Sequence, residues 1–230
     1  MSKIKLFVIA GHPDDEILGA YSYLSDPKYD AQSIFICEGS SARFTEEKNS
    51  QEVMKAINNR EQAALSIADQ LGNRRPIFLN FPNLALSAIP VININHKIEF
   101  HLDRFKPEIV ITHSKNCNNL DHSTISLAVS NLIRSNSHSY VKTILHMEIP
   151  SSTEQSLATS FQPNHFVELI ESQVENKIFL LSKYGEELQK DPGPRSGHGI
   201  KAYAAFRGVA SGNYFAEAFE IVRKITRKDE

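Results

Sequence analysis

The residues with the clearest potential for chemistry form one short cluster near the start of the chain. His12, Asp14, Asp15 and Glu16 are interrupted only by Pro13, whose fixed φ angle stiffens the turn. His12 and Asp15 stand three residues apart, so on a tight turn they can converge on one point with Asp14 beside them. Imidazole and carboxylate together are a ligand set that suits zinc or ferrous iron. The cluster therefore predicts a metal site.

Three other interpretations explain part of this cluster. Asp14 or Asp15 could cap a following helix, because acidic side chains are favourable in a first helical turn, but capping leaves His12 without a role. The paired carboxylates could hold magnesium in a phosphoryl-transfer or receiver-like domain, where the histidine would again be surplus. A non-catalytic binding protein could retain a metal for structure. A structural zinc, however, is normally closed by four ligands with cysteine prominent, and Cys37 and Cys117 form no C-x-x-C pair, so Cys117 is expected to be a bystander.

A second polar group, Asn119-Leu120-Asp121-His122, offers the remaining ligand. A catalytic zinc needs about three protein ligands and an open position, and the first cluster supplies two. His122 is the preferred third ligand, because it follows a predicted strand, Glu108–His113, through a short polar loop. Its neighbour Asp121 could receive the proton of an imidazole, as carboxylates near metal-bound histidines do. His113, at the end of the strand, is the competing ligand and ranks second.

The elements that must position these residues alternate between strands and helices. Short apolar, β-branched runs predict strands at Ile4–Ala10, Ser33–Cys37, Pro76–Asn80, Glu108–His113 and Thr143–Met147. Amphipathic periodicity predicts helices at Asn49–Leu71, which stops at Gly72, and at Val91–Phe105 and Ser123–Arg134. Right-handed βαβ units then give an α/β, Rossmann-like, doubly wound and mostly parallel sheet. Both polar clusters follow strands, so both fall at the sheet edge where such folds bind ligands.

The last third of the chain is less regular. It holds a predicted strand at Phe166–Ile170, an amphipathic helix at Ser172–Leu188, a loop at Asp191–Gly199, and the closing segments Ile200–Phe206 and Tyr214–Arg223. No internal repeat, linker or charge block divides the sequence. We therefore expect one domain over residues 1–230, with a core of roughly 1–150 and a C-terminal extension of roughly 151–230.

Composition excludes several classes of protein. The 230 residues carry 25 Lys and Arg against 27 Asp and Glu, a net charge of −2, so no broad basic surface for nucleic acid is expected. Hydrophobic residues at 41% and charged residues at 23% are ordinary for a globular protein. No apolar run approaches the ~18 residues of a membrane span, and two cysteines suit a reducing compartment. We expect a cytoplasmic protein without membrane insertion; the sequence is compatible with a homo-oligomer.

With both clusters in view, the sequence resembles the LmbE-like, PIG-L family of zinc-dependent de-N-acetylases. That family carries A-H-P-D-D-E after its first strand and H-x-D-H or N-x-D-H after its fourth, which stand here as Gly11–Glu16 and Asn119–His122. Further matches are Arg60-Glu61 with Leu71-Gly72, Pro150–Glu154, Pro194–Ser196, Arg207-Gly208 and Ala216–Phe219. The resemblance covers nearly the whole chain, and the late matches point loosely to a bacterial subgroup associated with sugar metabolism.

The resemblance implies a role for each residue of the two clusters. His12, Asp15 and His122 would bind one zinc ion, with ferrous iron as the alternative. Asp14 would be the general base, and Asp121 would orient a histidine. The implied substrate is a small molecule, an N-acylated sugar or sugar conjugate, from which the enzyme would remove an acyl group, by default acetyl.

The chain also departs from the family pattern. Asn119 stands where much of the family has histidine; asparagine can donate a hydrogen bond to an oxyanion but cannot relay a proton, so Asp14 would have to both take and return it. Asn83 replaces a frequent sugar-contacting Asp, and Arg195 lies in a Gly-Pro-Arg-Ser run in place of His-Pro-Arg-Ser. These departures favour an unusual acyl-sugar substrate. Arg43 and Arg60 are further candidates for contacts to substrate hydroxyls or a phosphate.

Overall fold

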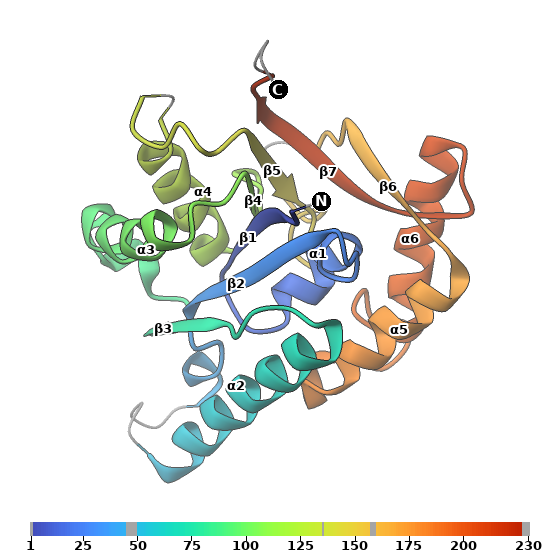
Figure 1. Ribbon diagram of the computed structural model, residues 1–230. Helices are drawn as coiled ribbons and strands as arrows, with labels where there is room; N and C mark the ends of the chain where they lie inside the picture. Colours follow the sequence, from blue (N-terminus) through green and yellow to red (C-terminus); the bar gives the residue numbers. More distant parts are fainter. Residues whose placement is uncertain (1, 45–49, 135, 157–159, 227–230) are drawn as a thin grey trace.

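The fold is organised around one sheet. The computed structural model describes residues 2–44, 50–134, 136–156 and 160–226, and in these ranges the strand order is β3-β2-β1-β4-β5-β7-β6 (Figure 1). The strands are β1 (Ile4–Ala10), β2 (Tyr29–Cys37), β3 (Ile77–Phe81), β4 (Ile109–His113), β5 (Thr143–Met147), β6 (His165–Leu169) and β7 (Phe215–Lys224). Strands β1 to β5 pair in parallel, whereas β7 is antiparallel to both β5 and β6. The predicted α/β, mostly parallel sheet is confirmed.

Helices cover both faces of the sheet (Figure 1). They are α1 (Asp15–Leu24), α2 (Gln51–Leu71), α3 (Val91–Phe105), α4 (Leu120–Leu132), α5 (Glu171–Ser182) and α6 (Gly197–Ser211), with short 3₁₀ turns η1 (Ser41–Arg43), η2 (Leu86–Ala88) and η3 (Gly185–Glu187). One hydrophobic cluster joins the sheet to α1, α2, α5 and α6, and a second joins it to α3 and α4. Side chains of β1 alternate between them: Leu6 and Val8 enter the first, Phe7 and Ile9 the second. Burial on both faces explains the continuous apolar run 6–10 within β1.

Capping residues decide where the helices begin. The predicted helix Ser123–Arg134 begins earlier, at Leu120, because Asn119 is its N-cap: Asn119 Oδ1 accepts the backbone N–H of Asp121 at 2.9 Å. Helix α6 begins inside the predicted loop Asp191–Gly199, because the Ser196 hydroxyl accepts the Gly199 N–H at 3.0 Å. Both corrections follow from short polar residues that satisfy free N–H groups at a helix start.

Several other predicted boundaries differ from those of the structure. The predicted helix Ser172–Leu188 stops at Ser182, and after it Gly185 takes a φ of 64° that opens the 3₁₀ turn η3. Strand β2 begins at Tyr29, four residues before the predicted start. Asn49, the predicted start of α2, lies outside the described residues. The bounds predicted for β1, α3 and β5 are correct.

Strands β1 and β4 meet at the point where the strand order reverses. From β1 the chain moves outward through β2 and β3, and from β4 it moves the other way through β5. Such a switch point opens a crevice at the carboxyl ends of the strands. The first polar cluster follows β1 and the second follows β4, so the topology brings the two together, and Gly11 N–H donates to His113 Nε2 across the junction at 2.7 Å.

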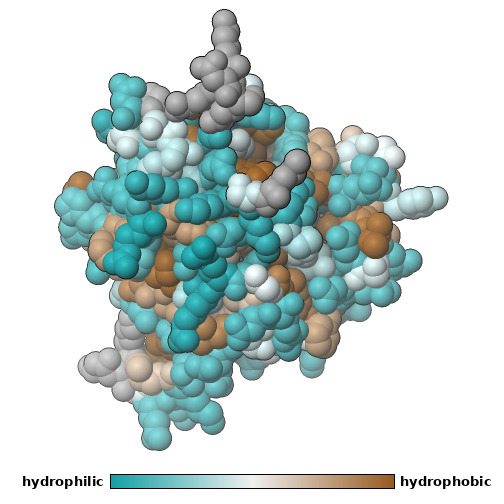
Figure 2. Space-filling model, in the orientation of Figure 1, coloured by the Kyte–Doolittle hydropathy of each residue, from teal (hydrophilic) through white to brown (hydrophobic). Residues whose placement is uncertain are grey.

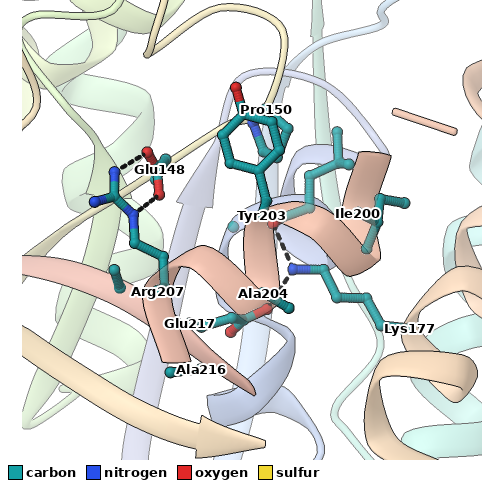
Figure 3. A pocket seen from close by; sticks show the side chains of 12 residues that line it. Glu148, Pro150, Lys177, Ile200, Tyr203, Ala204, Arg207, Ala216 and Glu217 are labelled. Atoms are coloured by element: carbon teal, nitrogen blue, oxygen red, sulfur yellow. Dashed lines mark hydrogen bonds and ion pairs between the residues drawn. The ribbon is translucent and has the colours of Figure 1, made fainter. Parts of the chain in front are cut away.

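The C-terminal residues extend the same sheet, because β7 inserts beside β5 and carries β6 on its other edge. Figure 3 shows how this part is held: Lys177 of α5 points at Glu217 of β7 and also donates to Leu18 O at 2.8 Å, while Arg207 of α6 points at Glu148 at 2.9 Å. The small cavity among these side chains holds about 30 Å³, room for water but not for a substrate. These ion pairs are therefore structural.

The face of the molecule drawn in Figure 2 shows no large apolar patch among the described residues. In Figure 2 hydrophilic residues cover most of the visible side, with hydrophobic residues in separated patches. Among the described helices, none is both long and apolar enough to cross a membrane.

Candidate active site

Three donor atoms from the two clusters converge on one point. His12 Nδ1 lies 3.2 Å from Asp15 Oδ2, Asp15 Oδ2 lies 3.1 Å from His122 Nε2, and the two nitrogens are 3.3 Å apart. Ligand atoms on a tetrahedral zinc, with bonds of roughly 2.0–2.1 Å, stand about 3.3 Å from one another. Asp15 Oδ1 is buried and has no partner among the described residues. The donor set and this orphaned oxygen both fit a divalent ion such as zinc.

His113 and His122 are the two candidates for the third ligand, and their contacts differ. His113 Nε2 accepts the Gly11 N–H, so it is already committed, and its ring stacks on that of His122 with centroids 3.7 Å apart. Burial and the neighbouring His122 lower the pKa of His113, which keeps it neutral. His122 Nε2 lies closer to Asp15 Oδ2, at 3.1 Å, than His113 Nε2 does, at 3.5 Å. Gly11 makes room for this ring, because a Cβ there would lie 2.8 Å from His122 Cδ2.

Asp121 supports His12 from the opposite side of its ring. Its Oδ2 lies 3.1 Å from His12 Nε2, and the carboxylate also accepts the N–H groups of Leu84 at 2.7 Å and Leu86 at 3.1 Å. Burial alone would raise the pKa of Asp121, but the bonds to His12 and the two amides hold it below its ordinary value. A carboxylate fixed in this way sets the tautomer and orientation of a metal-binding histidine.

Asp14 lies between His12 and Asp15 in the sequence, and it has a strained backbone conformation. Its φ of 133° is rare for a residue with a side chain. The side chain makes no helix-capping bond; instead Oδ1 pairs with Arg60 at 3.0 Å and Oδ2 with Arg195 at 2.8 Å. Burial raises the pKa of Asp14 to about 6, although both arginines oppose the shift. Capping therefore does not explain this carboxylate.

Glu16, which belongs to the first cluster, holds the backbone of Asp14, and it is held in turn by Tyr184, a residue that the sequence reasoning did not consider. Glu16 Oε2 accepts the Asp14 N–H at 2.9 Å, and the Tyr184 hydroxyl donates to Glu16 Oε1. Burial raises the pKa of Glu16 to about 8. Tyr184 lies far along the chain in a segment that reads as helix, so no local signal pointed to it.

Glu187 is a second residue that the sequence reasoning missed, and it forms ion pairs with three arginines of the site. It pairs with Arg43 at 2.5 Å, Arg60 at 3.1 Å and Arg195 at 3.2 Å. Burial alone would raise the pKa of Glu187, but these arginines lower it. Arg60 also donates to the carbonyl of Pro13 at 2.8 Å and to that of Gly39. Most donors of Arg60 are thus used inside the protein, whereas the Arg43 side chain is 49% exposed.

These residues surround an open cleft of about 190 Å³. Its wall is formed by His12, Asp14, Gly39, Ala42, Arg43, Arg60, Asn83, Leu84, Asn119, Glu187 and Arg195. Asp15, Asp121 and His122 are fully buried and do not form part of this wall. Asn83 enters it with its backbone N–H bonded to Glu38 at 2.9 Å. A neighbouring groove of about 760 Å³ shares Arg43, Arg60 and Glu187 with the cleft.

Solved structures share this fold at low sequence identity. The N,N'-diacetylchitobiose deacetylase of Pyrococcus horikoshii has a TM-score of 0.73 at 17% identity, over 95% of this chain and 84% of that one. A deacetylase of teicoplanin biosynthesis has a TM-score of 0.72 at 14% identity, over 97% and 100%. The 4-carboxy-2-hydroxymuconate hydratase of Pseudomonas putida has a TM-score of 0.72 at 18% identity, over 98% of each chain. The fold is thus shared by proteins named for different reactions.

Comparison at the level of sequence gives the family. No curated protein matches the chain significantly. The family described as PIG-L, GlcNAc-PI de-N-acetylase, matches residues 7–133, more than half of the chain and a range that holds both polar clusters. The resemblance carried by those clusters is confirmed, and the chain belongs to the PIG-L family of GlcNAc-PI de-N-acetylases.

Proposed function

We propose that this protein is a zinc-dependent hydrolase that removes an acyl group, by default acetyl, from the nitrogen of an amino-sugar-containing small molecule. The observation that carries the proposal is the triangle of His12 Nδ1, Asp15 Oδ2 and His122 Nε2, with edges of 3.1–3.3 Å, beside the Asp14 carboxylate in the cleft. Family membership and the deacetylases among the structural neighbours support the same reaction.

His12, Asp15 and His122 would hold the metal. Two imidazoles and one carboxylate suit zinc or ferrous iron better than magnesium, which prefers oxygen ligands. This composition argues against a phosphoryl-transfer site built on Asp14 and Asp15. A bound zinc ion would supply Lewis acidity that lowers the pKa of water and polarises a carbonyl oxygen.

Asp14 is the group placed to move the proton. It lies next to ligand Asp15, and its two oxygens are aimed by Arg60 and Arg195. A carboxylate held in this way can accept a proton from the attacking water and return it to the departing amine. The strained backbone of Asp14 is consistent with a position kept for chemistry at a cost to stability.

Asn119 would steady the carbonyl oxygen as negative charge develops there. Its Oδ1 is engaged in capping α4, so the Nδ2 donor is the part of the amide that can serve the cleft. Arg195, whose Nη1 contacts Asp14, is the second group able to stabilise that charge.

The cleft and its surroundings restrict the substrate. A volume of about 190 Å³ suits a single sugar ring, and the adjoining groove offers room for a larger substituent. Arg43 and Asn83 are the wall residues we assign to hydroxyl or anionic groups of the substrate. The arginine-rich wall and the hydratase among the neighbours make it necessary to test amide hydrolysis against other reactions.

The test is an assay of the zinc-restored protein on a panel of N-acetylated sugars, nucleotide sugars and glycoconjugates. Release of primary amine and acetate in equal amounts, lost in Asp14→Asn and after chelation, is the expected result. Hydration of an unsaturated carboxylate without amine release would replace the proposed function. Binding of sugars with no turnover across the panel would favour the non-catalytic alternative.

A further inference from the structure

The two histidines of the metal site differ in what contacts their second ring nitrogen. His12 Nε2 faces the Asp121 carboxylate at 3.1 Å, whereas His122 Nδ1 faces the thiol sulfur of Cys117 at 3.2 Å. A metal-bound histidine normally donates this second N–H to an acceptor that fixes its tautomer and ring orientation. For His122 the only such contact found among the described residues is the sulfur.

We propose that Cys117 is a positioning residue for the metal ligand His122. Its Sγ accepts the Nδ1–H of His122, which leaves Nε2 unprotonated and directed at the ion. This inference rests on the proposed metal-dependent function, and it is an alternative to the expectation that Cys117 is a bystander.

The sulfur is itself held in place from a second loop. Cys117 is 6% exposed and its N–H donates to Ser114 O at 3.2 Å. The Thr153 hydroxyl donates to Cys117 Sγ at 3.7 Å and accepts the Ile149 N–H at 2.9 Å. The thiol therefore links the loop after β4 to the loop after β5, and it has little freedom to move away from the imidazole.

Other contacts of His122 leave this role open for the sulfur. Stacking on His113 fixes the plane of the His122 ring, but a half-turn of the ring within that plane's stack would keep the stacking and exchange the positions of ring nitrogen and carbon atoms. The contact between Nδ1 and the Cys117 sulfur selects one of these two orientations. Cys117 cannot share the same ion with His122 Nε2, because the two ring nitrogens point in divergent directions. Cys117 is also absent from all three groups of His, Cys, Asp and Glu that could hold an ion among the described residues.

The experiment compares Cys117→Ala, Cys117→Ser and the control Asn118→Ala, which alters an exposed neighbour in the same loop. Zinc affinity is measured in chelator-buffered titrations, the cobalt-substituted proteins are compared by visible absorption, and the Tm of each metal-free protein reports folding. Cys117→Ala should bind zinc about 10–100-fold more weakly with an altered cobalt spectrum. Cys117→Ser, which retains an acceptor, should recover part of the affinity, and Asn118→Ala should match the parent.

Equal zinc affinity and equal cobalt spectra in Cys117→Ala and the parent would overturn the inference. So would a thiolate-to-cobalt charge-transfer band in the parent that Cys117→Ser lacks, because the sulfur would then be a direct ligand. If Cys117→Ala does not fold, the serine variant alone decides by the same criteria. A parent protein that binds no divalent ion rejects both the inference and the proposed function. Cys117-dependent metal binding without hydrolysis of any N-acylated sugar upholds the inference and rejects the function.

Discussion

Asp14 and Glu187 lie 173 residues apart in the sequence, yet they share the same two arginines. Arg195 Nη1 is 2.8 Å from Asp14 Oδ2 and 3.2 Å from Glu187 Oε2, and Arg60 bridges the two carboxylates in the same way at 3.0 and 3.1 Å. Glu187 thus neutralises guanidinium groups that would otherwise pair with Asp14 alone. The position of the proposed base depends on a carboxylate from the C-terminal part of the chain.

Glu187→Gln should therefore lower both stability and turnover. Leaving buried guanidinium groups without their partner should cost about 1–3 kcal/mol of unfolding free energy. The pKa of Glu187 is lowered in the folded protein, so its ionised form stabilises fully above the ordinary glutamate pKa of about 4.3, and the stabilisation is lost as pH falls through the lowered pKa. The difference in unfolding free energy between the parent and Glu187→Gln should be largest near neutral pH and should disappear in acid. Denaturation at several pH values measures this difference. The exposed neighbour variant Glu186→Gln is the control; a gap that persists in acid would contradict this account.

Asp14→Asn and Asp15→Ala should fail in different ways. The amide at position 14 preserves shape but removes the base, so metal content should stay near one ion per chain while kcat falls by roughly 10²–10⁴-fold. Asp15→Ala removes a proposed ligand and should lose the metal. Elemental analysis beside steady-state kinetics distinguishes the two, and the reverse pattern would exchange their roles.

His122→Ala should lose the ion, whereas His113→Phe should keep it with an affinity about 10–100-fold weaker. Phenylalanine can still stack on His122 but cannot accept the Gly11 N–H. Metal content after dialysis against a weak chelator measures both. Full metal retention by His122→Ala would make His113 the ligand instead.

Position 119 combines a helix cap with a proposed catalytic donor, and two variants separate these roles. Asn119→Ser keeps a capping oxygen but is too short to reach the substrate, so it should retain stability and lower kcat by about 10²-fold. Asn119→Ala should show the same kinetic loss and also destabilise the protein by about 1 kcal/mol. Parent-like kcat in Asn119→Ser would leave Asn119 with the structural role alone.

Arg43 and Arg60 should respond differently although both line the cleft. Arg43 is half exposed at the rim, so Arg43→Ala should raise KM with little change in kcat or Tm. Arg60→Lys should lower Tm and kcat together, because an ammonium group cannot replace the guanidinium bonds to Pro13, Gly39, Asp14 and Glu187. Unchanged KM for Arg43→Ala across the substrate panel would remove that residue from substrate binding.

The sequence alone determined the class of fold and the place of the two polar clusters. Continuous apolar, β-branched runs and three- and four-residue periodicity are local patterns, and they predicted β1, α3 and β5 with correct bounds. Because parallel strands end at one sheet edge, the positions of His12 and His122 after two strands already implied that they meet. The family could be recognised from the same clusters.

Tertiary structure decided which of the candidate side chains are free for chemistry. His113 and His122 are equivalent by residue type, but in the fold the Gly11 N–H occupies His113 Nε2. Glu187 gave no signal, because a single charged residue has no periodicity and its partners Arg43 and Arg60 come from distant elements. Cys117 lies only five residues before His122, but the fold decides which ring nitrogen faces its sulfur. Helices α4 and α6 begin earlier than predicted, because the side chains of Asn119 and Ser196 accept N–H groups of the first turn. Whether such a hydrogen bond forms depends on backbone geometry and not on composition. Local propensity thus sets the elements, whereas long-range hydrogen bonds assign the donors and acceptors of the site.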